Sequence, residues 1–383
     1  MIKRKASTLL VIAAVLGGTL AACSSGDSTS SGAASSTSAG LTSCASSTSG
    51  APGAAGPPGG GAPSIPTAKT IAPSDTGTST VIDGSGPQIQ CGKTPLTTTT
   101  DVLYDTPTTA GKQVPLKLDI QVPKTPGKKP LVVYITGGGF ILDDKSGNLD
   151  QRTHVAEQGY VVASIEYRTV KNGATYTDSV ADVKSAIRFL RAHADQYDIT
   201  TSKVAVWGQS AGGYLAAMTG VTNGLKQFED TGNPDQSSTV QAVVDQFGPS
   251  DISKVAADYD AAVQKADYAA GSPFAQFVFG PGTPLSVQDD PTAMAAANPA
   301  TYVTPSSPPF VLLHGSADQL ASPSQTLILH NALRAKGVDS TRYVVQGANH
   351  GDRTFMGDPN AARQWSSQQV VGYIVSFLNK HLG

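Results

Sequence analysis

The sequence has few aromatic and few charged residues, and the aromatic ones are unevenly placed. Aromatic side chains make up 6% of the 383 residues and charged side chains 15%, both low for a globular protein. No Phe, Trp or Tyr occurs before Tyr104. We therefore expect a single globular domain in the C-terminal three-quarters of the chain, which is long enough to bury a full core.

An excess of positive charge and a set of metal ligands are also missing. The 27 Lys and Arg residues nearly balance the 29 Asp and Glu residues, so the composition gives no basic surface for nucleic acid. Only three cysteines occur, without zinc-ligand spacing, and there is no His-Glu-x-x-His pattern. We expect no nucleic-acid partner, no metal and no organic cofactor.

The N-terminus has the pattern of an export signal. Three basic residues at positions 3–5 precede an apolar run at 9–22, which is shorter than the roughly 20 residues that cross a bilayer. The run ends in Leu-Ala-Ala-Cys23, which resembles the lipobox of bacterial lipoproteins, in which the cysteine is acylated. We interpret residues 1–22 as a lipoprotein signal peptide and expect an exported protein, held on the cell membrane by lipid at Cys23 and facing outside the cytoplasm. The alternative is an ordinary secretory signal that leaves Cys23 as an incidental thiol.

A long polar segment follows. Between residues 24 and 68 the chain consists largely of Ser, Thr, Ala, Gly and Pro, and Asp27 is its only charge. Such a composition predicts a disordered tether, which we place at residues 23–92, before a catalytic domain at 93–383. Cys44 and Cys91 form an even pair in an oxidising compartment, so a disulfide between them is one hypothesis and two free thiols the other.

The remaining chain alternates strand and helix patterns. Short apolar runs predict strands, and residues 178–194 and 368–381 carry the apolar stripe of amphipathic helices. This alternation predicts an α/β fold whose mostly parallel sheet has helices on both faces, with ligands bound beyond the carboxyl ends of the strands. The five predicted strands are 131–135, 161–165, 204–207, 243–247 and 310–313.

Three strand ends carry candidate catalytic residues. The sequence Gly-Gln-Ser210-Ala-Gly-Gly follows one strand and precedes a helix; Gly-x-Ser-x-Gly is weak alone, but this context is that of a nucleophile turn. Asp318 and His350 follow two later strands, so the chain order Ser, Asp, His is the one α/β-hydrolases use. We interpret His314 as a packed structural residue, and Asp352 is the alternative acid.

The glycine run after strand 131–135 is the candidate oxyanion hole. Backbone N–H groups of Gly138 and Gly139, with that of Ala211, would stabilise the charge of a tetrahedral intermediate. A phosphate-binding loop is the competing interpretation. It fits poorly, because the Gly-x-Gly-x-x-Gly spacing fails at Leu142 and no Gly-Lys-Ser/Thr follows.

From about Tyr104 onward the chain resembles serine carboxylesterases of the α/β-hydrolase superfamily, especially the bacterial branch of feruloyl-esterase-like and acetyl-esterase-like enzymes and formamidases. The resemblance implies that Ser210, Asp318 and His350 are the triad, and that Tyr167, Arg168 and Asp182 are structural. It rests on seven collinear stretches: 135–140, 166–168, 181–190, 206–213, 247–251, 308–318 and 347–350.

Two features depart from that pattern or extend it. The family usually begins its glycine run with His, whose ring helps to hold the loop, whereas this chain has Thr136. We therefore expect an active enzyme whose oxyanion loop is less rigidly set.

The segment at residues 253–301 is too long for a simple crossover between strands, so we predict a cap insertion there. Its residues Tyr259, Tyr268, Phe274, Phe277 and Phe279 either line a substrate pocket or pack the cap onto the core.

The predicted function is hydrolysis of short-chain acyl or aryl carboxylic esters through an acyl-enzyme. The substrate is expected to be a small-molecule ester or an acylated polysaccharide. Amide or formamide cleavage by the same triad and a catalytically inactive binding protein on the hydrolase scaffold are the alternatives. The sequence gives no oligomeric state.

Overall fold

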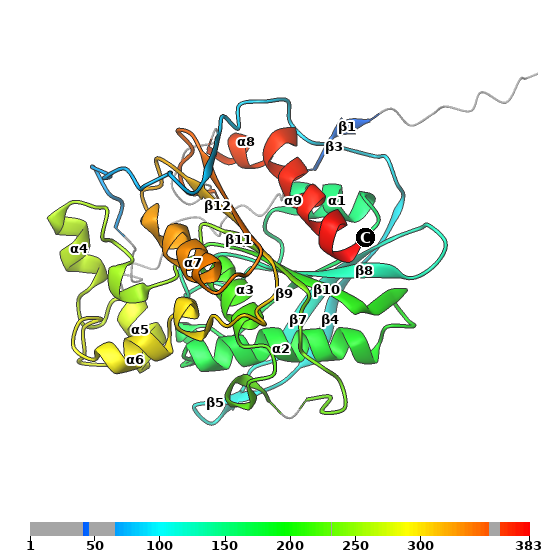
Figure 1. Ribbon diagram of the computed structural model, residues 1–383. Coiled ribbons are helices and arrows are strands. Elements are labelled where there is room, and N and C mark those ends of the chain that lie inside the picture. The colour runs from blue at the N-terminus through cyan, green and yellow to red at the C-terminus, as the bar shows by residue number, and fades with distance from the viewer. Residues whose placement is uncertain (1–40, 46–65, 231, 352–360) are drawn as a thin grey trace, which may run out of the picture. The chain divides into compact units, whose positions relative to one another are not determined.

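The computed structural model describes residues 41–45, 66–230, 232–351 and 361–383, which belong to one unit. The signal peptide, Cys23 and Asp352 lie outside the described residues. The centre of the unit is a nine-stranded sheet with the order β2-β13-β12-β11-β10-β8-β9-β7-β4 (Figure 1). Its strands are β2 (Thr80–Ile82), β4 (Leu96–Asp105), β7 (Leu116–Pro123), β8 (Lys129–Ile135), β9 (Val161–Ile165), β10 (Ile199–Gln209), β11 (Ala242–Gln246), β12 (Phe310–Gly315) and β13 (Ser340–Val345).

The sheet is parallel from β2 to β9, and β7 and β4 add an antiparallel edge. Every residue of β9, β11 and β12 is buried, as expected for parallel strands that are covered on both faces. All five predicted strands are present, so the predicted mostly parallel α/β sheet is confirmed. Two further pairs lie outside this sheet: β1 (Thr42–Ser43) with β3 (Gln90–Cys91), and β5 (Thr108–Thr109) with β6 (Lys112–Gln113).

Helices cover both faces of the sheet, and the core has two layers. Successive residues of β8 point to opposite sides, so that Val133 joins one layer and Val132 the other. The first layer contains residues of α2 (Tyr176–Ala192), α3 (Ala211–Val221) and α7 (Ser324–Ala335). The second contains residues of α1 (Leu149–Glu157), α8 (Ala361–Trp365) and α9 (Gln368–Leu382), which lie together above the sheet in Figure 1.

Three short helices between β11 and β12 form the predicted insertion at 253–301. They are α4 (Ala261–Asp267), α5 (Pro273–Phe279) and α6 (Pro291–Ala296), which gather at the left of Figure 1. Each begins at a residue whose side-chain oxygen accepts a hydrogen bond from the first turn: Asp260, Ser272 and Asp290. These caps, with a proline at the start of α5 and α6, define where each helix starts.

The boundary that we placed at residue 93 is too late. Strand β2 pairs with β13 in the main sheet, Ile82 is 5% exposed, and Ala68 is 1% exposed. Residues 66–92 therefore belong to the folded unit. Their few apolar side chains are enough to bury this segment on a domain that already exists, even though its composition would not let it fold alone.

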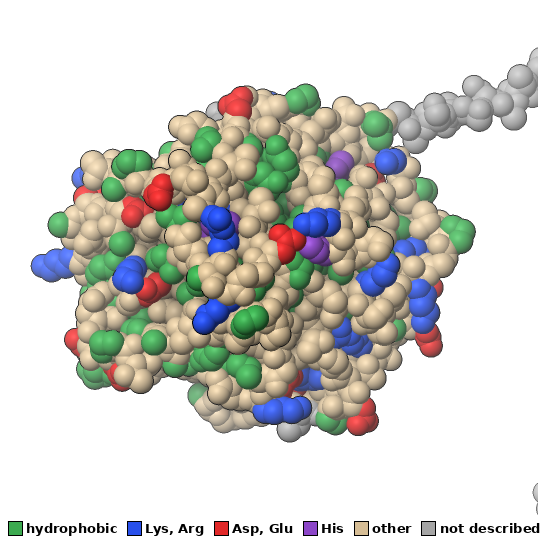
Figure 2. Space-filling view, viewed as in Figure 1, with side chains coloured by type: hydrophobic (Ala, Val, Ile, Leu, Met, Phe, Trp, Pro, Cys, Tyr) green, Lys and Arg blue, Asp and Glu red, His purple; other side chains and the backbone are tan. Residues whose placement is uncertain are grey.

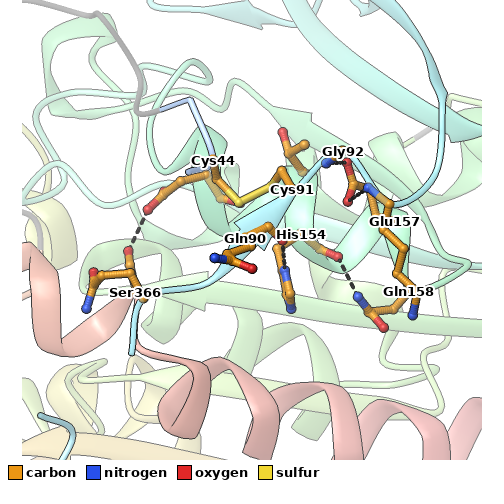
Figure 3. Close-up of a disulfide and its surroundings, with 12 residues drawn as sticks. Cys44, Gln90, Cys91, Gly92, His154, Glu157, Gln158 and Ser366 are labelled. Atoms are coloured by element: carbon orange, nitrogen blue, oxygen red, sulfur yellow. Dashed lines mark hydrogen bonds between the residues drawn. A yellow bond between two sulfur atoms is a disulfide. The ribbon is translucent and has the colours of Figure 1, made fainter. Parts of the chain in front are cut away.

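A disulfide joins Cys44 to Cys91, with the two Cα atoms 4.8 Å apart (Figure 3). Cys91 is buried at the end of β3, close to α1. The Nδ1 atom of His154 on α1 lies 2.9 Å from the Gln90 carbonyl oxygen, and Glu157 accepts hydrogen bonds from the backbone N–H groups of Gly92 and Lys93. Residues 41–45 are in this way covalently attached to the α1 side of the domain.

The surface is mixed in charge. On the face shown in Figure 2, Lys and Arg side chains alternate with Asp and Glu side chains among uncharged ones, as the near-balance of charge predicts. In the part of the chain that the structure describes, no helix has the length and apolarity needed to cross a membrane.

Candidate active site

Ser210 lies on a strained turn between β10 and α3. Its backbone has φ 55° and ψ −122°, a conformation that L-residues rarely adopt, and its N–H donates to the Gln246 carbonyl at 2.9 Å. The flanking glycines are required by close backbone contacts. A Cβ on Gly208 would lie 2.0 Å from the Gly212 oxygen, and a Cβ on Gly212 would lie 2.0 Å from the Ile135 oxygen. The Gly-x-Ser-x-Gly spacing therefore follows from the tightness of this turn.

The structure brings Ser210, His350 and Asp318 together. The Nε2 atom of His350 lies 2.7 Å from Ser210 Oγ, and its Nδ1 atom lies 2.8 Å from Asp318 Oδ2. A carboxylate can only accept, so Nδ1 carries the proton and Nε2 accepts from the serine hydroxyl. Asp318 is fully buried and His350 is 4% exposed. The three side chains have the geometry that a nucleophile, a base and an orienting acid require.

Asp318 is held as a carboxylate. Its Oδ1 atom accepts hydrogen bonds from the backbone N–H groups of Leu320 and Ala321, at 2.9 and 3.0 Å. Burial alone would raise the pKa of Asp318, but His350 and His314 outweigh that effect, and the pKa of this carboxyl lies below its usual range. Asp318 therefore keeps its charge at neutral pH and can stabilise a protonated His350.

Side chains around the His350 loop fix its position. The Asn349 side-chain oxygen accepts hydrogen bonds from the backbone N–H groups of His350 (2.7 Å) and Gln319 (3.0 Å), linking the loop of the base to that of the acid. The ring of Phe247 lies 4.7 Å from the His350 ring. Sequence reasoning assigned no role to Asn349 or Phe247; their positions beside the glycines of 347–351 and at the end of a strand were the available signals.

The glycine run after β8 forms a tight loop beside Ser210. Gly138 and Gly139 have φ 156° and 59°, and a Cβ on Gly138 would lie 2.2 Å from the Leu142 oxygen. A Cβ on Gly137 would lie 3.0 Å from Ser210 Cβ. The loop therefore passes directly against the nucleophile turn. Helix α3 begins at the same turn, and the N–H group of Ala211 is the first of the helix. The glycine run and the first turn of α3 therefore lie next to Ser210, and the role of Gly138, Gly139 and Ala211 as an oxyanion hole stays a prediction.

Tyr167 holds this loop at both ends. Its hydroxyl lies 3.0 Å from the Thr136 carbonyl oxygen and 3.3 Å from that of Leu142. Thr169 Oγ1 also donates to the Ile141 carbonyl at 3.2 Å. The Thr136 side chain takes no part in this, since its buried hydroxyl has no hydrogen-bond partner among the described residues. In this chain the loop is held by hydrogen bonds to its backbone carbonyl groups, including that of Thr136, and not by the Thr136 side chain.

Arg168 and Asp182 form a buried ion pair below Tyr167. Asp182 is fully buried on α2 and accepts from the Arg168 backbone N–H at 2.7 Å and from its guanidinium at 2.7–3.0 Å. Arg168 lies between Tyr167 and Thr169, which hydrogen-bond to the loop, and its side chain contacts Asp182, Asp178 and Thr109. This placement agrees with the structural roles that the resemblance implied.

The aromatic residues of the cap mostly pack against the core. The Phe277 ring stacks on Phe140 with centroids 3.9 Å apart, and Phe274 and Tyr214 contact Phe140 edge-on. Tyr259 is 6% exposed and donates to the Asp318 carbonyl at 3.1 Å. Tyr268 and Phe279 are only partly buried. Of the two interpretations, packing holds for the three buried cap residues, Tyr259, Phe274 and Phe277.

One cluster of potential metal ligands lies away from the triad. Ligand atoms of Cys44, Cys91 and His154 lie within 4.8 Å of one another. Both sulfurs belong to the disulfide, however, and only a thiolate is a good metal ligand. The cluster is therefore part of the disulfide's surroundings in Figure 3.

Comparison with known proteins shows that this chain is similar to esterases. The sequence model of the BD-FAE family matches residues 118–333. The chain is 27% identical over 224 residues to esterase LipC of Mycobacterium tuberculosis, covering 58% of this chain and 53% of that protein. It is 27% identical over 252 residues to the probable isoprenylcysteine alpha-carbonyl methylesterase ICMEL1 of Arabidopsis thaliana, covering 65% of this chain and 51% of that protein. It thus spans about half the length of these relatives. A truncated carbohydrate esterase from gut microbiota superposes with a TM-score of 0.64 and 25% identity, over 77% of this chain and 99% of that one.

Proposed function

Since the chain belongs to the BD-FAE family of α/β-hydrolases, we propose that it hydrolyses carboxylic esters with Ser210 as nucleophile, His350 as general base and Asp318 as the orienting acid. The single observation that carries this proposal is the continuous contact from Ser210 Oγ to His350 Nε2 (2.7 Å) and from His350 Nδ1 to Asp318 Oδ2 (2.8 Å). The strained backbone of Ser210 supports it, because strain of this kind persists mainly at functional sites.

The mechanism follows from these contacts. Ser210 Oγ attacks the ester carbonyl while its proton moves to His350 Nε2, and the imidazolium that results is stabilised by Asp318. The carbonyl oxygen becomes an oxyanion held by the N–H groups of Gly138, Gly139 and Ala211. Collapse of this intermediate breaks the ester bond, and His350 gives its proton to the departing alcohol. Water activated by His350 then releases the acid and restores Ser210.

Esters with short acyl or aryl groups are the proposed substrates. The rings of Phe274 and Phe277 are buried against Phe140 directly after the glycine loop, so they do not line a long acyl groove. The likeness to a carbohydrate esterase makes acylated polysaccharides a second source of such esters.

We also propose that the protein is exported and anchored by lipid at Cys23. The proposal is supported by the signal pattern that ends in Cys23 and by the Cys44–Cys91 disulfide, a bond typical of oxidising compartments. Metabolic labelling with palmitate tests it in a bacterial host. We expect lipid on the parent chain and none on Cys23→Ser, while equal labelling of the two would contradict the proposal.

The ester proposal is tested by hydrolysis of p-nitrophenyl acetate, butyrate and octanoate. We expect turnover of the acetate and butyrate, slow turnover of the octanoate, and loss of turnover in Ser210→Ala at an unchanged melting temperature. A folded parent that hydrolyses none of the three would favour the binding-protein alternative. Preferential cleavage of the matching p-nitroanilides would favour an amidase.

A further inference from the structure

We propose that His314 is a positioning residue for the triad acid, acting through a buried chain of polar contacts that runs from Arg342 through Thr326 and His314 to Asp318. This inference rests on the proposed function and extends it to a second histidine. His314 lies on β12, four residues before Asp318, and is fully buried. Its Nε2 atom lies 3.2 Å from Asp318 Oδ2, so the carboxylate has a histidine on each side.

The contacts of His314 determine where its proton lies. Nε2 faces two groups that can only accept, the Ala321 carbonyl oxygen at 3.0 Å and the Asp318 carboxylate. Nε2 must therefore carry a hydrogen, which it donates to the Ala321 carbonyl oxygen, with the Asp318 carboxylate 3.2 Å from the same nitrogen. Asp318 Oδ2 then accepts a hydrogen bond from His350 and has the polar N–H group of His314 beside it.

The other ring nitrogen is fixed from the opposite side. His314 Nδ1 lies 3.0 Å from Thr326 Oγ1, and Thr326 Oγ1 lies 2.9 Å from Arg342 Nε. A guanidinium can only donate, so the threonine oxygen accepts from Arg342 and its own hydrogen is available to the neutral ring at Nδ1. The threonine in this way selects the tautomer that places an N–H group beside Asp318.

Arg342 is a fixed anchor for this chain. It is 1% exposed, and all five of its N–H groups have acceptors within hydrogen-bond distance. Besides Thr326 these are two backbone carbonyls and two serine hydroxyls: Asp75, Pro323, Ser74 and Ser79. The buried cation at one end and the buried carboxylate at the other polarise Thr326 and His314 in the same direction. Three of the acceptors come from residues 74–79, which lie N-terminal to the match to the family.

The N–H group of His314 beside Asp318 has a definite electrostatic effect. Its positive end stabilises part of the Asp318 charge, which weakens the attraction of Asp318 for a protonated His350. Turnover needs His350 unprotonated, so removal of the His314 donor is expected to favour the inactive protonated form. Other titratable groups near this chain among the described residues include Tyr259, whose hydroxyl donates to the Asp318 carbonyl, and Asp258, whose carboxylate accepts from the Ser324 N–H. Asp75 lies at the Arg342 end of the chain.

The test is the pH dependence of kcat and of kcat/KM for p-nitrophenyl acetate in His314→Leu, His314→Gln and Thr326→Val. For His314→Leu we expect kcat to fall about tenfold or more with KM little changed, because the Asp318 carboxylate loses a contact that holds it in line with His350 Nδ1. The acid limb of the pH profile should move to higher pH by about half a unit, because the Asp318 charge is no longer shared with His314. His314→Gln keeps an N–H donor near the same place, so most of kcat and the original limb should return. Thr326→Val should shift the limb in the same direction by a smaller amount.

His330 offers a matched control. It is buried like His314, at 1% exposure, and its ring nitrogens contact the Ser340 hydroxyl and the Thr78 carbonyl; in the part of the chain that the structure describes, no hydrogen bond joins it to Ser210, Asp318 or His350. His330→Gln is expected to lower the melting temperature and to leave the pH profile in place. Fluorophosphonate titration of each variant gives the fraction of intact sites, so that kcat is measured per folded molecule.

The outcomes separate this inference from the proposed function. A folded His314→Leu with the parent's kcat and acid limb would overturn the role of His314, and so would an equal shift in His330→Gln. A parent protein as inactive as Ser210→Ala would overturn the proposed function itself. If His314→Leu does not fold, His314→Gln and Thr326→Val decide the matter. A shift of the acid limb of the pH profile in Thr326→Val, without a shift in His314→Gln, supports the proposed chain of contacts. An unchanged acid limb and an unchanged kcat in both variants contradict it.

Discussion

Replacing Tyr167 with Phe tests whether a single hydroxyl sets the oxyanion loop. The ring would keep its buried place, so no cavity forms, and only the hydrogen bonds to the Thr136 and Leu142 carbonyls at 3.0 and 3.3 Å are lost. Loss of a buried hydroxyl that leaves carbonyl groups unsatisfied costs about 1–3 kcal/mol of unfolding free energy. We expect Tyr167→Phe to fold with a stability lowered by that amount.

The effect of Tyr167→Phe on turnover can be bounded. Removal of one whole oxyanion donor typically costs about 10²–10³ in kcat. Tyr167 donates nothing to the oxyanion itself and acts by holding the backbone that carries the donors. A smaller loss, of about tenfold in kcat with KM nearly unchanged, is therefore expected for p-nitrophenyl acetate.

A second tyrosine provides the control for this prediction. Tyr160 is 3% exposed, and its hydroxyl donates to Asn379 Oδ1 at 2.6 Å in the other core layer. Tyr160→Phe should lower the unfolding free energy by a similar amount and leave kcat unchanged. An unchanged kcat in Tyr167→Phe, or an equal loss in Tyr160→Phe, would refute the reasoning.

Three further predictions concern position 136, the disulfide and a buried acid. Thr136→His should not raise kcat and should lower the melting temperature, because the site is 3% exposed and the loop is already tied by Tyr167; a higher kcat would show that the loop is loosely set. Removal of the disulfide in Cys44→Ser/Cys91→Ser, which opens a loop with a sequence separation of 47, should lower the unfolding free energy in urea by about 2–4 kcal/mol without changing kcat. Burial raises the pKa of Asp245 to about 7, so the parent should lose up to about 4 kcal/mol of stability relative to Asp245→Asn as pH rises from 4 to 7 in urea unfolding.

The Asp245 prediction has a definite sign, and a specific result would contradict it or the disulfide prediction. An Asp that stays protonated in the fold but ionises near pH 4 when unfolded stabilises the fold at low pH, and this contribution disappears as pH rises through the folded pKa. Parallel stability curves for the parent and Asp245→Asn would contradict the raised pKa. Unchanged stability of the double serine variant would show that residues 41–45 add nothing to the fold.

The sequence was sufficient for the centre of the sheet and for the candidate catalytic residues because both depend on local patterns. Continuous apolar runs predicted the five parallel strands β8 to β12; Ser210 and Asp318 each follow one of these, and His350 follows the neighbouring parallel strand β13. In a parallel sheet the carboxyl ends of strands share one edge, which brings residues 140 positions apart into contact. The nucleophile turn was also predictable, since its glycines are required by contacts within the turn itself.

What the sequence did not predict depends on contacts between distant segments. Strand β4 at the antiparallel edge is Thr-rich and largely exposed, and β7 beside it alternates apolar and polar residues, so both give a weaker signal than a continuous apolar run. Residues 66–92 looked like tether because their composition is polar, whereas Ala68 and Ile82 bury themselves on surfaces supplied by the rest of the domain. The role of Tyr167 under the loop and the contact of His314 with Asp318 likewise depend on tertiary placement.

The most direct test of the central claim is labelling by a fluorophosphonate followed by peptide mass spectrometry. An activated serine reacts quickly with such a probe, whereas an ordinary surface serine does not. The account predicts one phosphonyl group per chain, located on Ser210, with labelling lost in Ser210→Ala and greatly slowed in His350→Ala. Absence of labelling in the folded parent, or modification at another serine, would contradict it.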